Sequence, residues 1–204
     1  MALYLQDQTE QVYRQVYRFM GNKNIQEFHL GDFSNSIGGC FLESDIMFAA
    51  IGSSNRAKCN QLLEEYPDIK SNMLNFILVL DGELSISIDY IPYKIVKNTL
   101  LEISPFNRIN HAHLSDDFSG YLIMASRNFI SDTLADRKPI PISQFLDLRE
   151  KPYGFLTDEG TAVIRASMEK LEYYLKIPEH TFKKRLDFQL FLHIHPGNGE
   201  LIHQ

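Results

Sequence analysis

Arginine, histidine and tyrosine side chains occur close together in one stretch of the sequence, between residues 108 and 121. The guanidinium of Arg108 suits a carboxylate or phosphate on a ligand, because it presents several donors in a fixed plane. His111 and His113 have the two-residue spacing that places side chains on one side of a strand. With Tyr121, they are the predicted ligand-binding residues at one end of a sheet. The alternative is a surface arginine, two solvated loop histidines and a core tyrosine.

The familiar patterns of nucleophilic and phosphate-transfer chemistry are missing from the sequence. No glycine-rich phosphate loop follows a strand-like run, and no Gly-x-Ser-x-Gly motif occurs. His193, His195 and His203 lie near the C-terminus, but they surround a Pro-Gly break in a segment without a structural pattern. We therefore predict no catalytic residue and do not expect an enzyme.

The composition is that of a folded domain rather than a disordered or nucleic-acid-binding segment. Of the 204 residues, 44% are hydrophobic and 23% are charged, which allows a sizeable core. The net charge of −6 argues against direct binding to nucleic acid or to an anionic membrane. Two cysteines, no signal-peptide pattern and no apolar run of membrane length predict a cytoplasmic protein with no membrane partner.

Short strand-like runs separated by turn signals position the residues described above. Residues 76–80 and 46–51 are continuous apolar runs, whereas residues 83–89 alternate polar and apolar side chains. Residues 93–96, 99–103 and 120–125 are predicted as further strands, and Asp81-Gly82 as a turn. Tyr90-Ile91-Pro92 is predicted as another turn, and a polar loop is expected from Arg108 to Asp117. This spacing is typical of a sandwich or a small barrel.

Three segments of this region resemble the N-terminal cupin-like domain of AraC-family transcription regulators. They are Leu80-Asp81-Gly82-Glu83-Leu84-Ser85-Ile86, then residues 98–105 ending in Ile103-Ser104-Pro105, then Asp116-Asp117-Phe118-Ser119-Gly120-Tyr121. The resemblance covers roughly residues 74–192. It implies an α+β fold in which a cupin-like antiparallel β-roll or barrel is followed by two C-terminal helices. The roll is expected over residues 1–150, the paired helices over 151–195 and an unstructured tail over 196–204.

The same resemblance implies a function and partners. The chain is expected to be the ligand-sensing and dimerisation part of an AraC-type regulator, which binds a small-molecule effector and forms a homodimer. The alternative is a free-standing cupin-like metal-binding protein or enzyme. Cupin enzymes hold a metal through histidines and a carboxylate, and their first motif places His-x-His shortly after a glycine. Leu84 to Asp89, which follow Gly82, contain no histidine, so we predict no metal and no cofactor.

Helical spacing outside the strands predicts how the chain packs or pairs. Residues 7–20 and 56–66 have one apolar face each, and a long helix is expected after Thr157, its predicted N-cap. Pro178 allows a second helix to begin there. In the first long helix, apolar residues recur at spacings of four, three and four, as in a heptad seam. This seam is either the dimer interface or a helix face packed on its own roll: Ile164, Met168, Leu171 and Leu175.

AraC-family regulators bind DNA through two helix-turn-helix units that follow the paired helices. The sequence ends soon after the second predicted helix and contains no pair of basic helices. DNA binding is therefore expected only through a C-terminal domain outside this chain. Either this chain is one part of a longer protein, or its gene is truncated or frameshifted. A truncated regulator could also form mixed dimers with intact relatives.

Overall fold

The computed structural model describes residues 37–42, 46–70, 73–105, 107–126, 129 and 151–177. Several predicted elements lie outside these ranges. They are the helix over residues 7–20, the second helix after Pro178 and the tail over 196–204.

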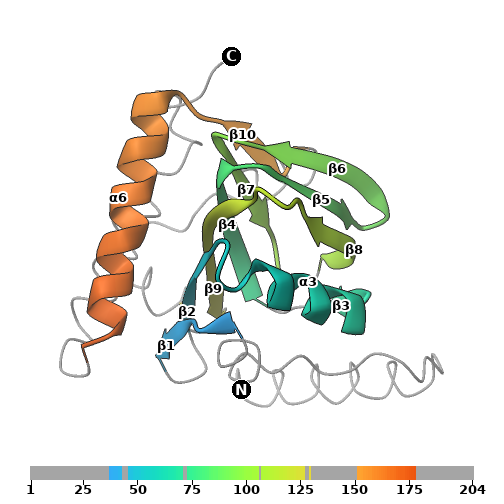
Figure 1. The fold of residues 1–204 in the computed structure, drawn as a ribbon, viewed down its shortest axis with the longest axis horizontal. Coiled ribbons are helices and arrows are strands. Elements are labelled where there is room, and N and C mark those ends of the chain that lie inside the picture. The colour runs from blue at the N-terminus through green and yellow to red at the C-terminus, as the bar shows by residue number, and fades with distance from the viewer. Residues whose placement is uncertain are drawn as a thin grey trace, which may run out of the picture.

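The described ranges form two antiparallel sheets and two helices (Figure 1). Sheet A contains, in spatial order, β1 (Cys40–Leu42), β2 (Ile46–Ile51), β9 (Ser119–Ser126), β4 (Met73–Asp81), β7 (Thr99–Ile103) and β10 (Tyr153–Phe155). Sheet B contains β3 (Asp68–Lys70), β8 (Arg108–Leu114), β5 (Glu83–Ile88) and β6 (Ile91–Val96). The helices are α3 (Arg56–Glu65) and α6 (Asp158–Leu175). This arrangement confirms the predicted α+β fold with an antiparallel, cupin-like roll.

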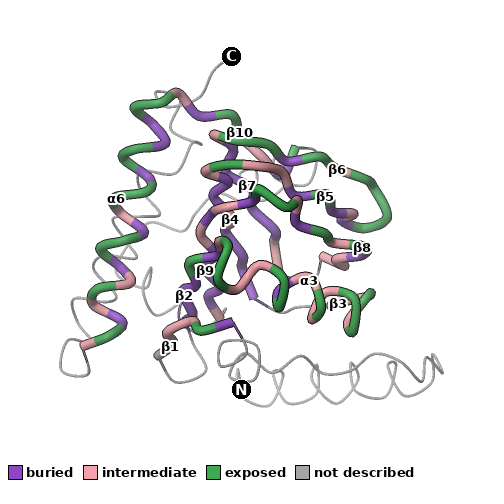
Figure 2. Tube along the Cα trace, viewed as in Figure 1, coloured by how far each residue is buried: buried purple, intermediate pink, exposed green. Residues whose placement is uncertain are grey.

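Sheet A is buried on both faces, which explains the continuous apolar run in β4. Phe76 and Leu78 belong to the cluster under α6, whereas Ile77 and Val79 belong to the cluster between the two sheets. Successive side chains of a strand point to opposite faces, so a strand covered on both sides needs apolar residues at every position. In Figure 2, buried residues accordingly follow the strands of sheet A and recur along α6 between exposed ones.

Two glycines of the motif are required by close backbone approaches. Gly82 has a φ of +70°, and a Cβ there would lie 2.6 Å from the backbone nitrogen of Phe118. A Cβ on Gly120 would lie 2.3 Å from the carbonyl oxygen of Leu78, on the neighbouring strand β4. Both glycines therefore serve the strand geometry, and neither indicates a binding site.

The polar loop predicted from Arg108 to Asp117 is wrong, because residues 108–114 form strand β8. Between Ser85 and Ser87 of β5 the register with β8 shifts, and His111 adopts a φ of +49°. A bulge of this kind places an extra residue in one strand and interrupts the alternation of polar and apolar residues. The interrupted alternation hid the strand from a sequence pattern of period two.

The predicted turn at Tyr90-Ile91-Pro92 also lies too far along the chain. Asp89 and Tyr90 have φ values of +50° and +69° and form the turn, while Ile91 and Pro92 already belong to β6. β6 stands at the edge of sheet B. A proline is tolerated there because an edge strand leaves some of its N–H groups unpaired.

Helix α6 begins as predicted. The side chain of Thr157 accepts a hydrogen bond from the backbone nitrogen of Gly160 at 3.0 Å, and Asp158 and Glu159 occupy the first turn. Strand β10 pairs with β7 directly before the helix and thereby fixes the place where α6 starts. The side-chain amide of Asn98 also donates to Asp158 across 2.7 Å.

Candidate ligand cavity

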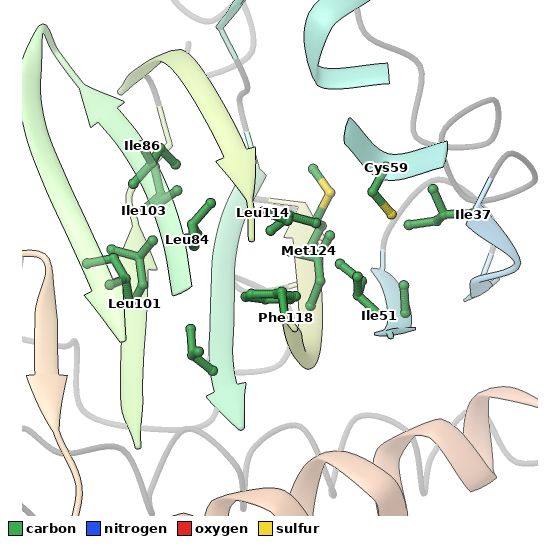
Figure 3. Packing of buried hydrophobic residues seen from close by; sticks show 14 of the residues in the cluster. Ile37, Ile51, Cys59, Leu84, Ile86, Leu101, Ile103, Leu114, Phe118 and Met124 are labelled. Carbon is green, nitrogen blue, oxygen red and sulfur yellow. The ribbon is translucent and has the colours of Figure 1, made fainter. Parts of the chain in front are cut away.

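A cavity of about 90 Å³ lies between the two sheets. Ile77 and Met124 of sheet A and Leu84 and Ile86 of sheet B line it, together with residues of α3. Figure 3 shows Leu84 and Ile86 gathered with Ile103, and Met124 beside Leu114. The inward positions of both sheets are aliphatic because alternate residues of each strand must form the core.

The cavity offers almost no polar chemistry. Of the lining side chains in the described ranges, Asn75 alone has a hydrogen-bonding amide. Its Nδ2 donates to the carbonyl oxygen of Met73 at 3.0 Å and to that of Ile103 at 3.5 Å, so this donor is used within the protein. None of these lining residues carries a charge. A charged group inside the cavity would therefore be buried without a partner, which is costly.

Helix α3 covers one side of the cavity with Cys59 and Leu63. Asn60 holds the helix against β8: its Nδ2 donates to the carbonyl oxygen of Leu114 at 2.8 Å, and its Oδ1 accepts from the same residue's N–H at 2.9 Å. Burial raises the pKa of the Cys59 thiol to about 11. The thiol is thus uncharged at neutral pH and adds no charge to the cavity wall.

Arg108, one of the predicted ligand residues, is already paired. Its Nε and one terminal nitrogen donate to the carboxylate of Asp68 on β3, and its guanidinium lies 5.3 Å from the ring centre of Tyr90. The hydrogen bond from Arg108 lowers the pKa of the Asp68 carboxyl. An anionic ligand at Arg108 would have to compete with this ion pair.

His111 and His113 are exposed on β8, whereas Ala112 between them lines the cavity. They lie on a strand, and both are solvated as the alternative interpretation expected. Arg108, His111 and His113 therefore belong to the strand beside the cavity, but their side chains do not line it.

Tyr121 lies on the opposite face of sheet A from the cavity. Its hydroxyl donates to Oε1 of Glu169 on α6 at 2.7 Å, and its ring centre is 5.4 Å from that of Phe48. The neighbouring Leu122 does line the cavity. The four predicted ligand residues are thus not brought together. The alternation of side chains along β9 is the sequence signal that could have shown this, because Tyr121 and Leu122 must face opposite sides of the sheet.

The seam of α6 packs on the chain's own sheet. Ile164, Met168 and Leu171 are each 0% exposed, and they form one cluster with Phe76 and Leu78 of β4. Leu175 is 6% exposed and belongs to the same cluster. This is the alternative in which the helix covers its own roll. The seam is therefore occupied by the chain's own sheet, and the pairing of two chains stays a prediction.

The described ranges hold no cluster of metal-binding side chains and no helix suited to crossing a membrane. In that part of the chain, no group of three or more His, Cys, Asp or Glu residues is placed to hold a metal ion. None of the helices described is both long and apolar enough to cross a membrane.

No protein-family model matches the chain, and no curated protein matches it in sequence. Solved structures similar to it include ToxT from Vibrio cholerae, with 10% identity and a TM-score of 0.41 over 60% of this chain and 45% of ToxT. The AraC-like transcriptional activator CuxR shows 9% identity and a TM-score of 0.38 over 79% of this chain and 51% of CuxR. The cupin domain of Cnp3 from Schizosaccharomyces pombe shows 8% identity and a TM-score of 0.30, over 49% and 70%.

The chain thus spans about half the length of ToxT and CuxR. With TM-scores of 0.30 to 0.41, these are distant likenesses, and none of them by itself assigns a function to this chain.

Proposed function

We propose that this chain is the sensing part of an AraC-type transcription regulator, and that its effector is a small molecule bound between the two sheets. The observation that carries the proposal is the apolar cavity beneath α3, inside the roll whose motifs resemble that family. A core filled to normal packing density leaves few voids larger than a water molecule, so a cavity of about 90 Å³ is a distinctive feature of this fold.

Sheet A connects the cavity to α6. In β4, Ile77 lines the cavity and Phe76 packs in the α6 cluster. In β9, Met124 lines the cavity and Ile123 packs in the α6 cluster. A ligand that binds one arrangement of these strands more tightly would also bias the position of α6. The helices are the elements that pair two subunits in the proposed regulator, so the ligand would act on subunit pairing.

The proposed regulator is a homodimer that binds DNA through a separate C-terminal domain. Because the seam is covered, a dimer through α6 would use its outward side, where Val163 and Tyr173 are 44% and 61% exposed. The net charge of −6 disfavours direct binding of this chain to the DNA backbone. The proposal includes no enzymatic activity, cofactor or membrane partner.

A chimera tests the sensing role. The chain is joined to a helix-turn-helix domain that lacks its own sensing part, and a reporter gene is measured against a panel of small molecules. We expect a compound that shifts the NMR signal of the Met124 methyl to change the reporter. Ala112→Leu, which fills the cavity, should abolish the response, while the matched Ala57→Leu on the exposed side of α3 should retain it. A reporter that ignores every compound bound in the cavity would refute the sensing role.

The dimer is tested separately by analytical ultracentrifugation. We expect the chain to sediment as a dimer and Tyr173→Glu to weaken the association at least tenfold, because it places a charge in the proposed contact. Tyr90→Glu, at another aromatic residue that is 68% exposed, is the control and should leave association unchanged. A strictly monomeric wild-type chain would contradict the homodimer.

A further inference from the structure

We infer that the cavity selects a compact, neutral, hydrocarbon-like molecule and excludes sugars, carboxylates and nucleotides. This inference rests on the proposed sensing function and names the chemical class of its ligand. It follows from the size of the cavity and the chemistry of its wall.

The size of the cavity limits the ligand to a few atoms. Apolar cavities of about 150 Å³ accept benzene or xenon, and sites for drug-sized ligands measure about 300–1,000 Å³. The cavity of about 90 Å³ is smaller than either. Sugars, nucleotides and long acyl chains therefore do not fit unless the two sheets separate.

The wall of the cavity excludes charge. Its lining combines branched aliphatic side chains with Met124, Phe118 and Cys59, and includes no Lys, Arg, Asp, Glu or His among the described residues. The amide nitrogen of Asn75 already donates to two backbone carbonyls. Arg108 is the cation nearest in sequence to the lining residue Ile109, but it is held by Asp68. A ligand that needs hydrogen bonds would lose those to water without replacing them.

Three probes of equal shape separate size from polarity. Isobutene, acetamide and acetate each have four non-hydrogen atoms in a planar Y, but they are apolar, neutral polar and charged respectively. They are titrated into the full chain with ¹³C-labelled methyl groups. We expect isobutene to shift the methyl signals of Met124 and Ile77 saturably. Acetamide and acetate should leave those signals unchanged at tenfold higher concentration.

Methionine supplies a matched internal control. Met168 lies in the α6 cluster on the other face of sheet A and is 0% exposed, so its methyl should not move with isobutene. A ligand of four atoms can bind with a Kd no tighter than about 40 μM, so titration must extend into the millimolar range. Stronger shifts of Met124 by acetate or acetamide than by isobutene, or no shift with isobutene, would overturn the inference.

A filled cavity provides the second measurement. Ala112→Leu should remove the isobutene-dependent shift at Met124 while the Met168 methyl keeps its position, which shows that the fold is intact. Retained binding in this folded variant would place isobutene elsewhere and overturn the inference. The wild-type titration with the three probes remains decisive if the variant does not fold.

The chimera distinguishes failure of the ligand class from failure of the proposed function. If isobutene binds at Met124 but no hydrocarbon changes the reporter, the sensing role fails and the ligand class stands. If a sugar or a carboxylate both shifts the Met124 methyl signal and changes the reporter, the sensing role stands and the ligand class fails.

Discussion

The two faces of sheet A are both buried and apolar, yet they are built differently. On one face, α6 places Ile164, Met168 and Leu171 against the sheet, and each is 0% exposed. On the other face, sheet B and α3 approach the same strands but leave a cavity of about 90 Å³. Figure 1 shows the helix along one side of sheet A and sheet B on the other.

The side chains of α6 fill the outer face, whereas the inner face brings two twisted sheets together, with Ile77 and Ile86 among the residues between them. Burying an aliphatic side chain contributes about 1.5–3 kcal/mol. The α6 face therefore contributes mainly stability, and the face toward sheet B retains space for a ligand. Substitutions of equal size should separate these two roles.

Truncating one methionine on each face should give the largest difference in stability. Met168→Ala removes contacts in the filled α6 face and should lower the free energy of unfolding by about 3–5 kcal/mol, within the range for such changes. Met124→Ala, which already borders the cavity, should lower it by only about 1–2 kcal/mol, because fewer contacts are lost. Urea unfolding followed by circular dichroism measures both. Equal losses would contradict the distinction between the faces.

Enlarging one alanine on each face should again destabilise the α6 face more than the cavity face. Ala125 is 0% exposed in the α6 cluster, so Ala125→Leu should destabilise the fold by about 1–3 kcal/mol through overpacking. Ala112→Leu extends into the cavity and should change stability by less than about 1 kcal/mol. Thermal unfolding of the two variants is the measurement. A larger loss for Ala112→Leu would mean that the cavity does not accept added volume.

A polar contact on the α6 face should affect stability without affecting the ligand. Tyr121→Phe removes the 2.7 Å hydrogen bond to Glu169 and should lower the free energy of unfolding by about 0.5–1.5 kcal/mol. Because Tyr121 faces α6, isobutene binding should remain within twofold of wild type. Weaker binding in Tyr121→Phe would show that this hydrogen bond takes part in the proposed coupling between the cavity and α6.

The smallest effect is expected from acid pH. Asp68, beside Arg108, and Glu169, beside Tyr121 and Arg165, have pKa values lowered in the folded state. The folded state thus binds fewer protons, and the stability that these groups contribute is complete above the ordinary carboxyl pKa of about 4. It is lost as the pH falls through the lower folded values. Each group contributes at most about 1 kcal/mol, because solvent screens partly exposed pairs.

Measuring the free energy of unfolding at pH 3 and at pH 7 tests whether stability falls on acidification. Asp68→Asn and Glu169→Gln should each reduce the difference in stability between the two pH values. A variant that loses as much stability as wild type on acidification would assign the effect to another carboxyl.

Regular strands could be read directly from the sequence. The strand over residues 99–103 and the alternating run over 83–88 appear as expected, and so does the N-cap at Thr157. The bulged strand β8 could not be found in this way, because His111 in the left-handed region breaks the alternation.

The predicted ligand residues do not line the cavity, and this has a different reason. Residue types that do chemistry attract attention in a sequence, and Arg108, His111, His113 and Tyr121 were chosen for that property. The residues that line the cavity are almost all aliphatic, and a filled core and a lined cavity have the same composition. No sequence signal separates Met124 from Met168, although one borders the cavity and the other fills the α6 face.

The sequence by itself determined most of the strands, the turn at Asp81-Gly82 and the apolar seam of α6, because these depend on local periodicity and on backbone limits at residues such as Gly82. The antiparallel roll was what the family resemblance implied. Tertiary structure alone decided that the seam covers its own sheet, that Arg108 is paired with Asp68, and that space remains between the sheets. The physical reason is that these outcomes depend on how well surfaces from distant segments fit together. Local side-chain patterns do not encode that fit.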